Sequence, residues 1–159
     1  MKNTILAAAV LLLLAACSSK KKAADFNNKI VNLEKELAPV YQDADRQMLR
    51  FKIGGKLDSI ARLSEKMEKV FDEKIGQLED TKAPDGEEAE TLKKDALNYF
   101  MQAKSMFTTS KKYGAATTRE QILQIDEECK DALNRIRAAS SALKATQKKF
   151  AEANGMKIK

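Results

Sequence analysis

Residues 122–150 read ILQIDEECKDALNRIRAASSALKATQKKF, and this stretch decides the fold class. Apolar or small side chains recur in it at alternating intervals of three and four residues: Ile122, Ile125, Cys129, Ala132, Ile136, Ala139, Leu143, Thr146 and Phe150. Such intervals place all of them on one face of an α-helix. The stretch therefore predicts a long amphipathic helix with one buried face.

The rest of the chain repeats this helical pattern three more times, and each repeat places a stripe of apolar side chains along one face of a helix. They are built on Phe26–Ala44, Leu57–Leu78 and Ala89–Phe107. The first stripe passes through Leu37 and Val40, and Pro39 inside it should kink the helix. No window shows the apolar–polar alternation of a β-strand.

Short polar segments separate the stripes. Gly54-Gly55 predicts a bend or break, because two glycines cost about 2 kcal/mol inside a helix. The segment 81–86 reads TKAPDG and predicts a turn. We therefore predict an all-α fold, an antiparallel up-down bundle of three to four helices, with four favoured. Whether residues 26–80 form one bent helix or two is left open.

The helix ends carry recognisable capping residues. Asp85 is expected to cap the third helix, and Gly114 is expected to close it. Thr117 with Glu120, or Thr118 with Gln121, fits a capping box for the last helix, which should end at 154–155. The predicted core includes one to three residues from every stripe: Ile30, Leu37, Leu57, Met67, Phe100, Ile125, Ile136 and Leu143.

The N-terminus has the features of a secretory leader. Lys2 supplies a positive charge, and Ile5–Ala16 is apolar or small without a charged residue. This segment is about half the length needed to span a bilayer as a helix. It ends with the small residues Ala15 and Ala16, followed by Cys17.

The tetrapeptide Leu14-Ala-Ala-Cys17 resembles the lipobox of bacterial lipoproteins. The resemblance implies cleavage between Ala16 and Cys17, lipidation of Cys17 and attachment to the membrane through it. The expected organisation is then a signal peptide over 1–16, a lipidated Cys and polar tether over 17–25, a helical domain over 26–155 and a basic tail over 156–159. Ser18 resembles the residue of lipoproteins sorted to an outer membrane, so the expected location is the bacterial cell envelope.

The composition excludes several kinds of catalytic site. The chain contains no His, which rules out Ser-His-Asp and Cys-His nucleophiles and His-containing zinc sites. The carboxylate pairs Asp43/Asp45 and Glu127/Glu128 do not share a helix face, and Asp85-Gly86 has only the tail of a calcium-loop pattern. We expect no catalytic residue, no cofactor and no metal site.

Charge and cysteine content point to an exported domain stabilised by packing. Removing residues 1–16 removes Lys2 and no acid, so the formal net charge falls from +6 to +5. With Cys17 lipidated, only Cys129 remains, and no disulfide can form within the chain. Cys129 lies in the apolar register and is expected to be core. The basic C-terminal residues lack interleaved aromatics, so nucleic acid is not an expected partner.

Four short blocks resemble a family of uncharacterised all-helical bacterial surface lipoproteins. They are FNNKIV at 26–31, APDG at 83–86, DALNYF at 95–100 and FAEANG at 150–155. The family more often has Pro-Phe-Asp-Gly at the second block, and the aromatic is absent here. The resemblance implies a helical surface lipoprotein and brings no catalytic residue with it.

Two functions of different classes are consistent with these patterns. The favoured one is a non-catalytic binding or structural module that presents a helix face to an envelope protein or an anionic polymer. The alternative is a carrier that opens its bundle around a small apolar ligand, with Met48, Met67, Met101 and Met106 as adaptable lining. The oligomeric state is left open.

Overall fold

The computed structural model describes the backbone of residues 2–156 and the side chains of residues 19–156. It contains four α-helices and a short 3₁₀ helix, and no strand among the described residues, which confirms the predicted all-α bundle. The elements in chain order are α1 (Lys2–Ile53), α2 (Leu57–Glu79), α3 (Glu87–Ser110), η1 (Lys111–Ala115) and α4 (Arg119–Ala153).

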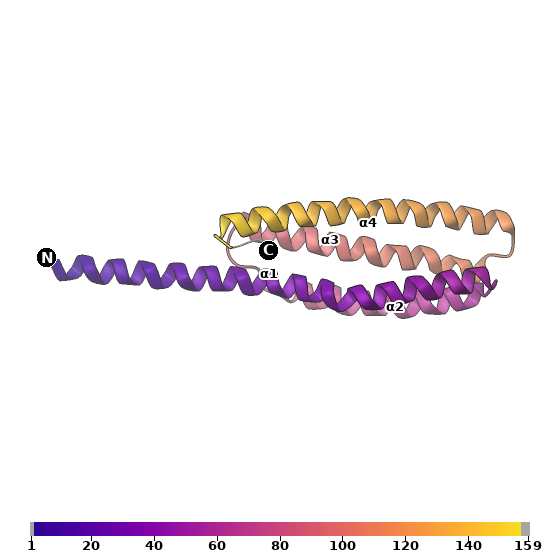
Figure 1. The fold of residues 1–159 in the computed structure, drawn as a ribbon, viewed down its shortest axis with the longest axis horizontal. Helices are drawn as coiled ribbons and strands as arrows, with labels where there is room; N and C mark the ends of the chain where they lie inside the picture. Colours follow the sequence, from indigo (N-terminus) through magenta and orange to yellow (C-terminus); the bar gives the residue numbers. More distant parts are fainter. Residues whose placement is uncertain (1, 157–159) are drawn as a thin grey trace.

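Each helix packs mainly against its neighbour in the sequence. α4 lies along α3, α3 along α2, and α2 along α1, and successive helices run in opposite directions (Figure 1). The C-terminal end of α4 lies at the end of the bundle where α1 enters. The N-terminal part of α1 extends beyond the other helices (Figure 1).

The break at Gly54-Gly55 is confirmed and forms the end of α1. Gly55 adopts a positive φ of 66°, which favours glycine. Its backbone N–H donates to the carbonyl of Lys52, and the N–H of Lys56 donates to that of Phe51. These two bonds form a Schellman motif, which satisfies carbonyls that the last turn of α1 leaves free. Residues 26–80 therefore contain two helices.

The α2–α3 connection differs from the prediction in one respect. Gly86, not Asp85, occupies the N-cap of α3, and no side chain caps this end. Glu87, Glu88 and Glu90 instead place negative charge in the first turn, where it is favourable to the helix dipole. Lys93 of α3 donates from Nζ to the carbonyls of Glu79 and Thr81, at 2.7 and 2.8 Å, and so closes the end of α2.

The α3–α4 connection confirms one predicted cap and corrects another. Thr118 and Gln121 form the capping box of α4, with the Thr118 hydroxyl accepting from the Gln121 N–H at 3.2 Å. Gly114 does not close α3, because the chain continues into η1 and Gly114 lies within it. Its role is steric: a Cβ at this position would lie 2.7 Å from the Cβ of Ala61 on α2. The predicted end of α4 at 154–155 is confirmed.

The core consists of two groups of buried side chains. The larger contains residues of all four helices, and the smaller joins Ile60, Tyr113, Ile125 and Cys129 near the α3–α4 connection. Six predicted core residues are buried: Ile30, Leu37, Met67, Phe100, Ile125 and Leu143. Leu57 and Ile136 are only half-buried, so their assignment to the core was wrong. Leu57 begins α2 at the end of the bundle, and Ile136 faces a gap between helices.

Two expectations about α1 also change. The stripe passes through Tyr41, not Val40, which is 40% exposed. The expected polar tether is helical. Ala23, three residues before Phe26, lies on the same helix face and is buried with it. The buried part of the domain therefore begins before residue 26. The helix continues through Pro39.

Candidate functional site

The predicted lipidation site lies outside the described side chains. Ala16 and Cys17 fall within the backbone range of α1, but their side chains are not described. Of the helices in the described part of the chain, none has a segment long and apolar enough to cross a membrane. The features below come from residues 19–156.

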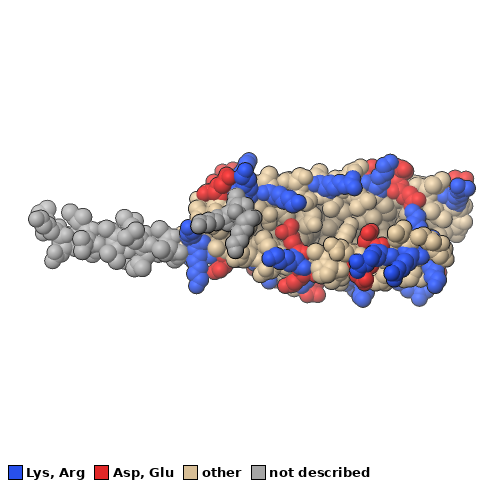
Figure 2. All heavy atoms as spheres, in the orientation of Figure 1, with Lys and Arg blue, Asp and Glu red and all other residues tan. Residues whose placement is uncertain are grey.

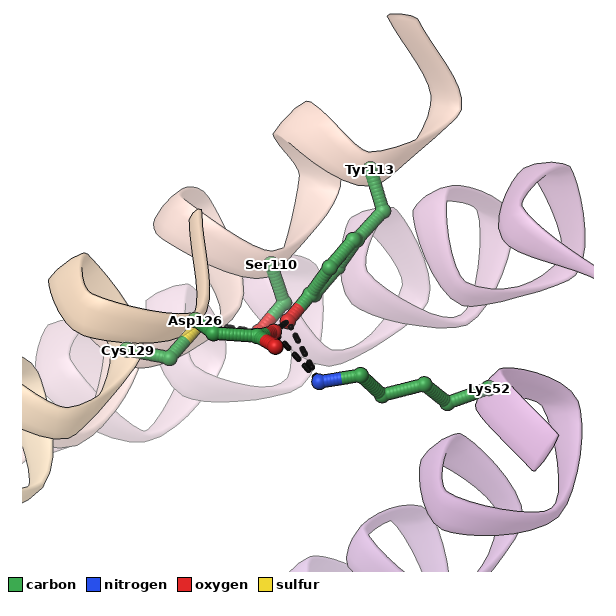
Figure 3. A network of polar contacts seen from close by, with 5 residues as sticks. All are labelled: Lys52, Ser110, Tyr113, Asp126 and Cys129. Atoms are coloured by element: carbon green, nitrogen blue, oxygen red, sulfur yellow. Dashed lines mark hydrogen bonds and ion pairs between the residues drawn. The ribbon is translucent and has the colours of Figure 1, made fainter. Parts of the chain in front are cut away.

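A polar network joins α1, η1 and α4 at the end of the bundle far from the N-terminus. The Asp126 carboxylate of α4 accepts hydrogen bonds from the ammonium of Lys52 and the hydroxyl of Tyr113 (Figure 3). Lys52 Nζ lies 3.2 Å from the Tyr113 hydroxyl oxygen and 5.3 Å from the centroid of its ring. These contacts hold the C-terminal end of α1 against the connection between α3 and α4.

The pKa shifts in this network oppose acid–base chemistry at neutral pH. Burial, followed by the hydrogen bond to Asp126, raises the pKa of Tyr113 far above its usual range. Burial also acts to raise the pKa of Asp126, but the hydrogen bonds from Lys52 and Tyr113 outweigh it and lower that pKa below 3.8. Tyr113 therefore keeps its proton and Asp126 keeps its charge, which suits a structural role.

Cys129 lies beside this network and is buried, as predicted for a core residue. Its Sγ is 3.5 Å from the hydroxyl oxygen of Ser110 (Figure 3), which itself donates to the carbonyl of Met106. Burial raises the pKa of the Cys129 thiol above 9.0. A thiol that stays protonated is a weak nucleophile, so the surroundings of Cys129 favour packing over reactivity.

The carboxylate pairs noted in the sequence are distributed over the surface. Asp43 accepts from Arg46 and Gln47 of the same helix, whereas Glu128 pairs with Lys112 at 2.5 Å and Glu127 with Lys130 at 3.1 Å. In residues 19–156, no three His, Cys, Asp or Glu side chains come together as a group that could hold a metal ion.

A groove of about 260 Å³ lies between α1 and α4, with α3 as its floor. Its walls include Glu34, Leu37, Tyr41, Tyr99, Phe100 and Ile136. Burial raises the pKa of Glu34 and that of both tyrosines above their ordinary values. Four of the lining side chains are aromatic, and Glu34 is the charged one.

Two contacts between α1 and α4 lie on either side of the groove. At one end the rings of Phe26 and Phe150 meet edge to face with centroids 6.0 Å apart. At the other end Lys52 pairs with Asp126. Between these contacts Ile136 of α4 faces the gap and stays half-exposed, which explains why its apolar register did not make it core.

A second, larger depression of about 690 Å³ lies at the end of the bundle where α1 enters. It lies between residues 19–29 of α1, the α2–α3 loop and the end of α4. Lysines and carboxylates alternate around it: Lys22, Lys29 and Lys82 with Asp25, Asp85 and Glu88. This mixture does not select a ligand of either charge.

The methionines proposed as ligand lining do not line the groove. Met67 is fully buried in the core, Met48 and Met106 are partly buried against it, and Met101 is 47% exposed at the surface. The residues that line the groove come from all four helices, so no local sequence pattern brings them together.

Comparison of the chain with protein-family models, with curated proteins and with solved structures found no match.

Proposed function

We propose that this chain is a lipid-anchored, non-catalytic binding module of the bacterial cell envelope. Its anchor is the lipidated Cys17, in the Leu-Ala-Ala-Cys segment that follows the apolar leader. A diacylated Cys holds a protein at a bilayer stably, because each buried methylene contributes about 0.8 kcal/mol. The location that fits best is the outer membrane, because Ser18 follows the Cys.

The binding role is carried by one observation, the charge of the C-terminal half of α4. Residues 132–151 contain five basic side chains and no Asp or Glu: Arg135, Arg137, Lys144, Lys148 and Lys149. All five are exposed. Figure 2 shows basic side chains recurring along α4. Such a surface attracts an anionic partner, and we assign it to an acidic envelope protein or an anionic polymer.

A second candidate function is favoured by the groove between α1 and α4. Its volume of about 260 Å³ approaches that of small-molecule sites in proteins, and its walls combine aromatic rings with one carboxyl group. A carrier of a small ligand would use this groove.

The anchor is tested by replacing Cys17 with Ala. The wild-type protein should sediment with membranes and incorporate a labelled fatty acid, whereas Cys17→Ala should be recovered in the soluble fraction without label. Cys129→Ala is the matched control, because it removes the other thiol and should leave fractionation unchanged. If wild type and Cys17→Ala fractionate alike and neither takes up label, the anchor is refuted.

The binding surface is tested by photocrosslinking in cells from position 145. Ala145 is exposed between the basic residues of α4, so a photoreactive side chain there should form a reproducible adduct with the partner. Reversing two charges, Lys144→Glu with Lys149→Glu, should reduce this adduct at least about tenfold, because an anionic partner is then repelled. The control reverses Lys66 and Lys69 on α2, which are equally exposed. An adduct equally sensitive to both reversals would contradict a role for α4.

A further inference from the structure

We propose that the groove between α1 and α4 binds a small organic cation with an apolar body, an aryl- or alkylammonium ion. This inference specifies the ligand of the second candidate function and rests on it. It is independent of the lipid anchor and of the basic surface of α4.

The shape of the groove is fixed by contacts outside it. The Phe26–Phe150 ring contact and the Lys52–Asp126 ion pair join α1 to α4 on either side of it. Small side chains, among them Ala103, line the space between. The groove therefore offers a preformed space, and a ligand that fills it need not push the helices apart.

The aromatic side chains make the groove suitable for a cation. Tyr41, Phe71, Tyr99 and Phe100 come from three helices and all contribute to its walls. Phe71 and Phe100 are fully buried, whereas Tyr41 and Tyr99 are half-buried, so the two tyrosine rings are the accessible ones. Cations are attracted to the faces of such rings, by about 2 kcal/mol or more where water is excluded.

The charge at the groove is negative and incompletely solvated. Glu34 is the charged residue among the lining side chains, and it is half-buried. Two side chains of α4, Gln147 by a hydrogen bond and Lys144 by its charge, act to lower the pKa of Glu34, but burial outweighs them. Among the described residues no ion pair joins Lys144 to Glu34, and Lys144 is exposed to solvent. A bound ammonium ion would place a counter-charge in direct contact with Glu34.

A neutral or anionic ligand fits this chemistry less well. A neutral apolar molecule would displace water from Glu34 without offering a polar contact in its place. Such a loss of hydration is costly for a carboxylate. An anion would also be repelled by Glu34. The combination of one partly desolvated carboxyl group with the two accessible tyrosine rings therefore selects a cation.

The proposal is tested by calorimetric titration of the full chain with benzyltrimethylammonium. The expected result is saturable binding at one site, at least about tenfold tighter than binding of benzyl alcohol, which has the aromatic body without the charge. Binding should weaken as the pH falls through the raised pKa of Glu34, because protonation removes the counter-charge. Phenylacetate should not bind.

Variants separate the role of Glu34 from general effects. Glu34→Gln should abolish the preference for the charged probe, while Glu36→Gln should leave it unchanged, because Glu36 pairs with Lys74 of α2 on another side of α1. Equal binding of charged and neutral probes by the wild type would overturn the cation preference and leave the carrier function standing. Absence of binding by both probes would overturn both. Tight binding that Glu34→Gln does not alter would place the cation elsewhere and overturn the site.

Discussion

Replacing Phe107 with Ala is expected to lower the free energy of unfolding by about 3–5 kcal/mol. Phe107 lies on α3 and is 1% exposed. Its ring centroid is 5.6 Å from that of Tyr41 on α1 and 5.7 Å from that of Phe71 on α2. The substitution therefore opens a cavity where three helices meet and removes two aromatic pairs. Urea denaturation followed by far-ultraviolet circular dichroism measures the loss.

The matched control is Phe51→Ala. Phe51 is also aromatic, but it is half-exposed near the end of α1, where it packs against the smaller core group. Its truncation exposes little new surface and leaves no enclosed cavity, so the cost should be clearly smaller. Equal losses for the two variants would contradict the position of Phe107 at the centre of the core.

Replacing Gly114 with Ala is expected to destabilise the fold by about 1–3 kcal/mol, the usual cost of an overpacked contact. The new Cβ would lie 2.7 Å from the Cβ of Ala61, which is closer than two such carbons can approach. Gly114 is not among the glycines with positive φ, so backbone strain is not the reason. At a site with free space the same change would stabilise by about 0.4–1 kcal/mol, because it restricts the unfolded chain.

The steric explanation predicts that Ala61→Gly rescues Gly114→Ala. Ala61→Gly alone should cost about 1 kcal/mol, since glycine is unfavourable within helix α2. In the double variant the clash is removed, so the total loss should be smaller than the sum of the two single losses. Denaturation of all four proteins gives the coupling free energy. Simple additivity would show that η1 and α2 can separate without cost.

The local features of the fold were predictable because their signals lie within a few residues. Gly54-Gly55 ends α1, and Thr118 with Gln121 begins α4, as expected from neighbouring residue types alone. Asp85 was a reasonable cap by the same rule. It fails because the chain begins its helical turn one residue later, at Glu87, and Gly86 takes the N-cap position.

The features that depend on how helices meet were not predictable. Ile136 has the register of a core residue. A groove separates α4 from α1 at this position, so the side chain lines the groove and stays half-buried. Lys52 and Asp126 are 74 residues apart, and each alone resembles any other surface charge. Periodicity identifies the face that a helix buries. It does not specify how closely the partner helix approaches.

The packing of each helix on its neighbour in sequence has a consequence for how the chain folds. Contacts between adjacent helices are local, so the bundle has a low contact order, and such proteins fold in about microseconds to milliseconds. The contacts between α1 and α4, Phe26–Phe150 and Lys52–Asp126, close the longest loops and bear the largest entropic cost of closure. The interface between α1 and α4 is therefore the part of the bundle that we expect to form last during folding and to open first during unfolding.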